Sequence, residues 1–319
     1  MELGPILLIR NDGETVVSLK EEEKNVFSLP DENYFFKILT GSDNITTKVK
    51  EILCQQKIDP PTTCSQKNIQ SFCFVTTDQL KSEAAILLFS LRQHHDQEVF
   101  VVADQPSIDY LKAFDFKNVN YKLFKVEEKV VSELRKKYDH INTFHKVDCI
   151  YAKMYAMEWA LESHSNTFFL DSDIIVLNSL QENFCLDICF SKHNHEEMRL
   201  DNRVGIYNAG YVFCSNKDFP NWWRENYITR SLFYEQECMN RAVQRFSLQI
   251  FSENHNVGFW RFKYPTNNIK SFHNHLSTSF DENQPAQIKE KNLKLRKFIY
   301  EYLQKNNFKE LLDFIKGVL

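Results

Sequence analysis

From residue 69 onward, short apolar runs alternate with longer segments whose apolar residues recur at helical spacing. IQSFCFVTT (69–77), EVFVVAD (98–104) and VNYKLF (119–124) are rich in β-branched and aromatic residues, which predicts strands. Between them, LKSEAAILLFSLRQHH (80–95) and SIDYLKAFDF (107–116) have the pattern of amphipathic helices. Strands that alternate with helices predict an α/β fold, in which a mostly parallel sheet carries helices on both faces.

The alternation continues for two more elements and then becomes irregular. CIYAKMYAMEWALES (149–163) predicts a long helix. NTFFLDSDIIVL (166–177) predicts a buried strand that runs into Asp171-Ser172-Asp173 before an apolar run resumes. Beyond this point strands and helices no longer alternate regularly. We therefore expect a regular α/β half to be followed by a second half in which this alternation is absent.

The first 57 residues differ from the rest of the chain in their pattern of apolar and polar residues. PILLIRNDGETVVSL (5–19) predicts two strands around an Asn-Asp-Gly turn, and YFFKILTGSDNITTKVKEIL (34–53) predicts a helix, a turn and a second helix. A Pro-Pro pair among polar residues then marks a linker. We therefore divide the chain into four parts: a small α+β appendage (1–57), a linker (58–68), an α/β domain (69–285) and a helical tail (286–319).

The helical tail has basic flanks around two amphipathic segments. Such apolar stripes usually pack on a core, which is the arrangement we expect, and contact with a membrane surface is the alternative.

Composition narrows the classes of function. The 319 residues carry 39 Lys+Arg against 43 Asp+Glu, which gives no reason to expect a nucleic-acid partner. No apolar run is long enough for a transmembrane segment, and the first residues lack the basic start of a signal peptide. The eight cysteines lack zinc-site spacing, so we expect free thiols and a cytoplasmic protein. With only 7 glycines and no glycine-rich loop, bound phosphates must be held by other means.

Polar residues follow three of the predicted strands at the point where each strand ends. Ligands of parallel α/β sheets bind at the carboxyl ends of the strands. The candidates at this edge are Thr76, Thr77, Asp78, Asp104, Asp171 and Asp173.

Asp171 and Asp173 form the strongest candidate metal site. Residues i and i+2 of an extended chain point the same way, so both carboxylates can face one point. Hard oxygen ligands of this kind suit Mg²⁺ or Mn²⁺, which complete their coordination with water and phosphate oxygens. One alternative is that the two aspartates cap a turn or pair with Lys and Arg. Another is a haloacid-dehalogenase-like phosphatase, but Ile174-Ile175 stand where that class has Gly-Thr.

Six segments in order resemble one family of enzymes. They are FVTTDQL (74–80), YAKMYAMEWAL (151–161), LDSDIIV (170–176), YNAGYVFCS (207–215), YEQECMN (234–240) and SFHNHL (271–276). Together they resemble the nucleotide-diphospho-sugar glycosyltransferases of the Rossmann-like GT-A fold, nearest to the retaining family that includes glycogenin and bacterial lipopolysaccharide galactosyltransferases. The resemblance covers roughly residues 70–280. It implies a metal-dependent transfer of a hexose, with retention, from a UDP-sugar to a glycan, lipid or peptide acceptor.

The resemblance also implies roles for individual residues. Asp171, Ser172 and Asp173 would hold Mn²⁺ or Mg²⁺ and the donor, with His273 as the third metal ligand and His275 as the alternative. Thr76, Thr77, Asp78 and Asp104 would contact the nucleotide, and Lys153 would neutralise its phosphates. Asn208 and Glu235 would bind sugar hydroxyls. Gln236 would lie near the anomeric carbon and stabilise an oxocarbenium-like state, because a neutral amide is a poor nucleophile.

The chain also departs from the family pattern. Lys153 stands where the family has Arg, which keeps the charge and loses the bidentate fork. His193 and His195 lie in the polar stretch HNHEEM, where we expect them to be solvated or part of an acceptor-side lid. The appendage loosely resembles peptide-binding winged modules, which implies an acceptor-binding role. The alternative to an enzyme is an inactive GT-A module that binds a sugar nucleotide or a peptide.

Overall fold

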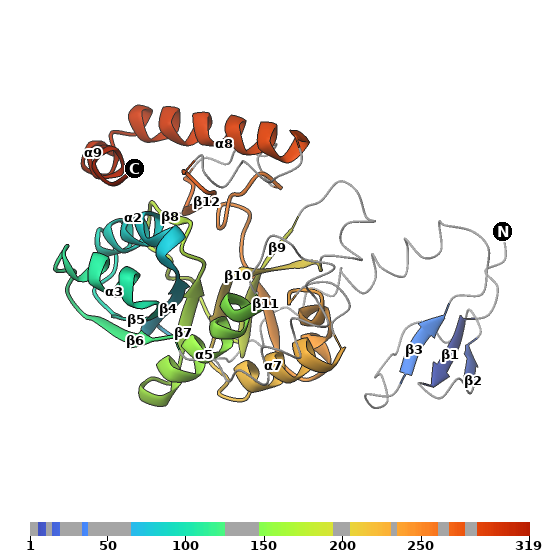
Figure 1. Cartoon of the computed structure of the whole chain (residues 1–319). Helices are drawn as coiled ribbons and strands as arrows, with labels where there is room; N and C mark the ends of the chain where they lie inside the picture. The colour runs from blue at the N-terminus through green and yellow to red at the C-terminus, as the bar shows by residue number, and fades with distance from the viewer. Residues whose placement is uncertain are drawn as a thin grey trace. The chain divides into compact units, whose positions relative to one another are not determined.

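The computed structural model describes most of the chain beyond residue 64, and three strands before it (Figure 1). The described ranges are 6–10, 15–19, 34–37, 65–124, 147–193, 205–230, 235–260, 268–277 and 286–319. The chain divides into two compact units, residues 1–59 and 60–319, and the boundary falls within the predicted linker.

The first unit contains a three-stranded antiparallel sheet. β1 (Ile6–Arg10) pairs with β2 (Thr15–Leu19), as the Asn-Asp-Gly turn predicts, and with β3 (Tyr34–Lys37) on its other side. The prediction of a helix at residues 34–37 is therefore wrong. Tyr-Phe-Phe favours a strand when a neighbouring strand offers backbone partners. The remainder of the predicted helix–turn–helix lies outside the described residues.

The second unit is built around a seven-stranded sheet whose strand order is β11-β9-β10-β7-β4-β5-β6. β10 pairs antiparallel with both of its neighbours, and every other pairing in the sheet is parallel. The prediction of an α/β fold with a mostly parallel sheet is thus confirmed. The strands are β4 (Ser71–Thr76), β5 (Glu98–Ala103), β6 (Val119–Leu123), β7 (Thr167–Leu170), β9 (Ile188–Lys192), β10 (Tyr207–Cys214) and β11 (Leu248–Ile250).

Alternate side chains of the strands enter cores on opposite faces of the sheet. On β4, Phe72 and Phe74 belong to one core, whereas Cys73 and Val75 belong to the other. The first core also contains α2 (Lys81–Arg92) and α3 (Gln105–Lys112), with the 3₁₀ helix η2 (Asp78–Leu80) preceding α2. The second contains α5 (Val147–Ser163), α7 (Phe219–Arg230) and the 3₁₀ helix η3 (Cys238–Gln244). The two-residue period of the strands accounts for helices on both faces.

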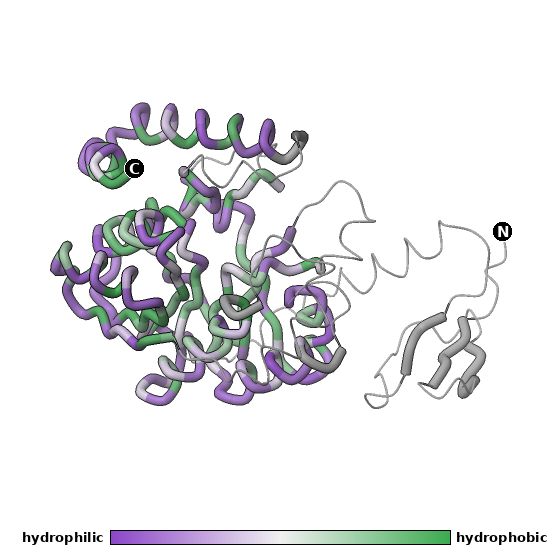
Figure 2. The backbone as a smooth tube through the Cα atoms, viewed as in Figure 1, coloured by the Kyte–Doolittle hydropathy of each residue, from purple (hydrophilic) through white to green (hydrophobic). Residues whose placement is uncertain are grey.

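A third core joins the tail to the domain. β8 (Ile174–Val176) and β12 (Ser271–His273) form a separate antiparallel pair, and α8 (Ala286–Lys305) lies above β12 in Figure 1. Apolar and polar residues alternate along α8 (Figure 2), and its apolar side chains share a buried cluster with Phe272 and with α9 (Lys309–Val318). The prediction that the tail packs on the domain is confirmed. Among the described residues, no helix is long and apolar enough to cross a membrane.

The tail also forms hydrogen bonds with the segment that follows β12. The buried guanidinium of Arg296 in α8 donates to the carbonyl oxygen of His275 at 2.9 Å. The side chain of Asn274 donates to the carbonyl oxygen of Asn292 in the same helix at 3.3 Å. Residues 274–275 are therefore held in place from the tail.

The cysteines differ from the expectation at one position. Cys73, Cys189, Cys214 and Cys238 are free and buried, as expected. Cys185 is disulfide-bonded, so the expectation of free thiols is wrong for this residue.

Replacement of Ile299 in α8 tests how the tail is held. Ile299 is fully buried in the third core, so Ile299→Ala should lower the free energy of unfolding by about 2–5 kcal/mol. The matched control is Lys297→Ala on the exposed face of the same helix, which should change it by less than about 0.5 kcal/mol. Urea unfolding of both variants measures the difference. An equal, small effect of the two substitutions would mean that α8 does not pack on the domain.

Candidate functional site

The two carboxylates predicted to bind metal lie between β10 and β12. Asp171 follows β7, and its backbone N–H donates to the carbonyl oxygen of Gly210 at 2.8 Å. Asp173 precedes β8, and its carbonyl oxygen accepts from the N–H of Asn274 at 3.1 Å. Residues 172 and 173 form a turn, so the carboxylates converge through this turn and not through an extended strand. Ser172 is buried within it.

His273 completes a group of three potential metal ligands. Its Nε2 lies 3.2 Å from Oδ1 of Asp173 and 3.9 Å from Oδ2 of Asp171. One ligand atom from each of the three residues lies within 4.8 Å of the other two. Burial opposes ionisation of Asp173, but His273 and His275 outweigh it and lower the pKa of this carboxyl group.

His275 faces a different partner. Its Nδ1 lies 2.9 Å from Oε2 of Glu83 in α2 and 3.6 Å from Oδ2 of Asp173. Burial opposes protonation of this ring, but Asp173 and Glu83 outweigh it and raise the pKa of His275 to about 9. The group of ligand atoms that lie within 4.8 Å of one another includes His273 and not His275, so the geometry favours His273 as the ligand. Sequence reasoning missed Glu83, which is buried although its helix is amphipathic.

Lys153 pairs with two carboxylates at once. Its Nζ lies 2.9 Å from Oδ1 of Asp171 and 3.3 Å from Oε1 of Glu235. Burial disfavours the charged amine, but Asp171 and Glu235 outweigh it and raise the pKa of Lys153. The alternative of a solvated lysine on the surface of α5 is therefore excluded.

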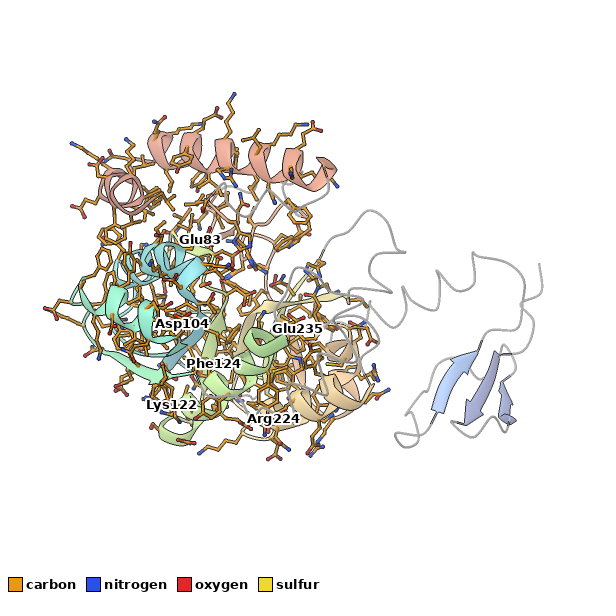
Figure 3. All side chains as sticks on the ribbon, viewed as in Figure 1. Glu83, Asp104, Lys122, Phe124, Arg224 and Glu235 are labelled. Atoms are coloured by element: carbon orange, nitrogen blue, oxygen red, sulfur yellow. The ribbon has the colours of Figure 1, made fainter. Side chains whose placement is uncertain are left out.

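These contacts join one continuous charged cluster. In order of contact it contains Glu235, Lys153, Asp171, His273, Asp173, His275 and Glu83. Four carboxyl groups thus face one lysine and one histidine with a raised pKa. Buried charge is costly unless it is paired, so this excess of acid would attract a divalent cation. Figure 3 labels Glu83 and Glu235, the two ends of the cluster.

Gly210 allows the ligands to approach the sheet. An added Cβ at this position would lie 2.5 Å from Cγ of Asp171 and 2.9 Å from Cε1 of His273. Those distances are shorter than any real contact of a Cβ atom. The register of β10 against β9 shifts between Asn208 and Val212, so Gly210 lies in an irregular part of this strand. Glycine is required at position 210 because the side chains of Asp171 and His273 lie too close for a Cβ atom.

Asn208 shapes this irregular part of β10 with the help of a buried histidine. The Asn208 side chain accepts from the N–H of Gly210 and donates to Nε2 of His193, both at 3.0 Å. Nδ1 of His193 lies 3.2 Å from the carbonyl oxygen of Gly205. His193 is 6% exposed, so the expectation of a solvated residue or a lid is wrong for it. Its polar neighbours in the sequence gave no sign that His193 is buried. His195 lies outside the described residues.

Glu235 and Gln236 precede η3, and Gln236 lies beside the same part of β10. Glu235 is buried, and its carbonyl oxygen accepts from the indole N–H of Trp223 at 2.9 Å. Gln236 is partly exposed, and its side-chain oxygen accepts from the N–H of Ala209 at 3.4 Å. The sequence predicted that these segments would share a pocket, and the structure brings them together.

The candidate nucleotide contacts lie at the ends of β4 and β5. The carboxylate of Asp104 caps α3 by accepting from the N–H of Ser107, and it accepts from the N–H of Asp78 at 2.8 Å. The side chain of Asp78 pairs with Lys81. Thr76 is buried, whereas Thr77 and Asp78 are accessible. Asp104 (labelled in Figure 3) therefore links the two strand ends, and the accessible surface there belongs to Thr77 and Asp78.

Comparisons with known proteins inform the fold. A scan against protein-family models finds no match, and a search of curated protein sequences finds none either. Among solved structures, the galactosyltransferase LgtC in complex with donor and acceptor sugar analogues matches with a TM-score of 0.50 and 11% identity, over 69% of this chain and 99% of LgtC. The glycosyltransferase GlyE of Streptococcus pneumoniae TIGR4 matches with a TM-score of 0.48 and 11% identity, over 76% of this chain and 64% of GlyE. At this identity the likeness to LgtC shows the fold, and the predicted GT-A fold is confirmed.

Replacement of Gly210 tests the close approach at the site. Gly210→Ala should displace Asp171 and His273, and should weaken Mn²⁺ binding by at least about tenfold, the range seen when the surroundings of metal ligands are disturbed. The matched control is Gly317→Ala, where no atom lies within 4 Å of the added carbon, and Mn²⁺ binding should be unchanged. Free Mn²⁺ measured by electron paramagnetic resonance (EPR) during a titration gives both affinities. Equal affinities would show that Gly210 does not limit the geometry of the ligands.

Proposed function

We propose that the second unit is a metal-dependent glycosyltransferase that transfers a hexose from a UDP-sugar to an acceptor. The observation that carries the proposal is the convergence of Asp171, Asp173 and His273 beside β10 of a GT-A-fold sheet. Ligands of such sheets bind where the strands end, which is where these residues lie. LgtC, a galactosyltransferase with the same fold, was solved with donor and acceptor sugar analogues.

The donor atoms fit a divalent cation. Two carboxylate oxygens and one imidazole nitrogen offer three ligands within 4.8 Å of one another, which leaves further coordination positions for water and phosphate oxygens. Carboxylates suit Mg²⁺ and Mn²⁺, whereas an imidazole nitrogen favours a transition metal, so Mn²⁺ matches this set better. When bound, the ion would act as a Lewis acid that stabilises the diphosphate leaving group.

The remaining residues of the cluster have separate roles in this proposal. Lys153 holds the carboxylates of Asp171 and Glu235 in a fixed relation and adds positive charge near the phosphates. Glu235 faces Lys153 and can accept from a sugar hydroxyl with its second oxygen. Asn208, by contrast, has its amide engaged with His193 and Gly210. We therefore assign it to shaping the irregular part of β10 as well as to lining the sugar pocket.

Gln236 is the residue proposed to lie near the reacting centre. Its amide is held against the N–H of Ala209, next to Gly210 and the metal ligands. A preorganised amide dipole can stabilise the positive charge that develops on the sugar as its bond to phosphate breaks. Retention of configuration follows from the family that the motifs resemble. The acceptor is a glycan, a lipid or a peptide, and residues 1–57 are proposed to help bind it.

Release of UDP from UDP-glucose or UDP-galactose tests the function. Turnover of the full chain should require Mn²⁺, and Asp173→Asn should lower it by at least about 10²-fold, because loss of a metal ligand forfeits several kcal/mol of transition-state stabilisation. Asp218→Asn, an exposed aspartate before α7, is the matched control and should keep the wild-type rate. Asparagine preserves the shape of the side chain, so the fold should persist in both variants.

Two outcomes would contradict the proposal in different ways. Unchanged release by Asp173→Asn would remove the metal site from the reaction. Binding of the sugar nucleotide with Mn²⁺, detected as a rise in melting temperature, without release of UDP in the presence of acceptors would identify the inactive binding module instead.

A further inference from the structure

The second ring nitrogen of His273 is held by a residue that no sequence motif singled out. Nδ1 of His273 lies 2.8 Å from Oδ1 of Asn256, and an amide oxygen can only accept. Nδ1 therefore donates its hydrogen to Asn256, and Nε2 is the ring nitrogen that faces Asp171 and Asp173. The amide nitrogen of Asn256 donates to Oγ of Ser191 in β9 at 2.9 Å, which fixes the orientation of the amide.

The backbone at Asn256 explains why asparagine stands there. Its φ is +53°, in the left-handed region, where asparagine is among the few tolerated side chains. Asn256 is fully buried, and its N–H donates to Oγ of Ser271 at 2.9 Å. Backbone and side chain together therefore aim the amide oxygen at His273.

A chain of buried hydrogen bonds continues from this point to the surface. Oγ of Ser271 donates to the hydroxyl of Tyr211 at 3.1 Å, so this hydroxyl can pass its own hydrogen to Nδ1 of His255 at 2.9 Å. Nε2 of His255 then donates to the carboxylate of Glu182 at 2.7 Å. Each group in this series therefore donates to the next one, from the N–H of Asn256 to the carboxylate of Glu182. The chain thus braces the Asn256 loop against β10 and the segment before β9.

We propose that Asn256 is a positioning residue that selects the tautomer of His273 and turns its Nε2 toward the metal site, with the Ser271–Tyr211–His255–Glu182 chain holding Asn256 in place. This inference rests on the proposed function only for the identity of the metal, since the hydrogen bond from Nδ1 to Asn256 exists without it. Residues beyond the ligands of a metal commonly fix a histidine in this manner.

Four forms of the full chain test the proposal: wild type, Asn256→Gly, Asn256→Asp and the matched control Asn254→Gly. Glycine keeps the left-handed backbone and removes only the amide, whereas aspartate restores an acceptor for Nδ1. Asn254 lies in the same loop, and its side chain bonds to Ser252 and to the backbone of Asn268. Two readouts apply. The first is the ¹⁵N chemical shifts of labelled histidine in the metal-free protein at alkaline pH, where the ring is neutral, with His273 identified from a His273→Gln sample. The second is Mn²⁺ affinity by EPR.

We expect the Nδ1–H tautomer of His273 in the wild type, in Asn256→Asp and in Asn254→Gly. Asn256→Gly should show a mixture of tautomers and should bind Mn²⁺ about 10- to 100-fold more weakly. An unchanged tautomer and unchanged affinity in Asn256→Gly would overturn the proposal. If that variant does not fold, Ser191→Ala replaces it, because it removes the hydrogen bond that orients the Asn256 amide. We expect a smaller loss of Mn²⁺ affinity in Ser191→Ala. An unchanged tautomer and an unchanged affinity would again overturn the proposal. A wild type that shows the tautomer and binds no Mn²⁺ would refute the proposed metal while leaving the positioning role of Asn256 supported.

Discussion

The partial burial of two neighbouring carboxylates, whose side chains are 25% and 10% exposed, is the constraint on which the site depends. Asp171 and Asp173 follow a strand whose side chains are all buried, and charge in such a place must be paired. Lys153 supplies one partner from α5. His273 at the end of β12 and His275 just after it supply the others. The paired cluster still contains more acid than base, which gives a divalent cation a place to bind. The proposed chemistry is a consequence of this imbalance.

The same constraint explains features that lie outside the charged cluster. Gly210 lacks a side chain because Asp171 and His273 occupy the space that a Cβ would need. The helical tail is part of the site because Arg296 holds the carbonyl group of His275. Asn256 adopts a left-handed backbone because its amide must meet Nδ1 of His273. Residues that touch no ligand are thus selected by the position of the two aspartates.

Much of this arrangement could be predicted from the sequence, because local pattern carries it. The strand before Asp171 and the strand that contains Asn-Ala-Gly are visible as short apolar runs with polar ends. The sheet follows from the alternation of such runs with helices. Glu83, His193 and Asn256 could not be found in this way, since their partners are distant in the chain: Glu83 meets His275 across 192 residues. Their own neighbours in the sequence are those of ordinary helix or loop residues. The roles of these three residues depend on tertiary contacts, which the local sequence does not show.

The central claim is that Asp171, Asp173 and His273 bind one Mn²⁺ ion that also holds a nucleotide diphosphate. Pulsed EPR of the Mn²⁺-loaded protein tests it most directly, because the spectrum reports the nuclei bound to the ion. The account predicts a ¹⁴N coupling that disappears in His273→Gln, and a ³¹P coupling that appears when UDP is added. A Mn²⁺ signal without nitrogen coupling, or without phosphorus coupling at saturating UDP, would contradict it.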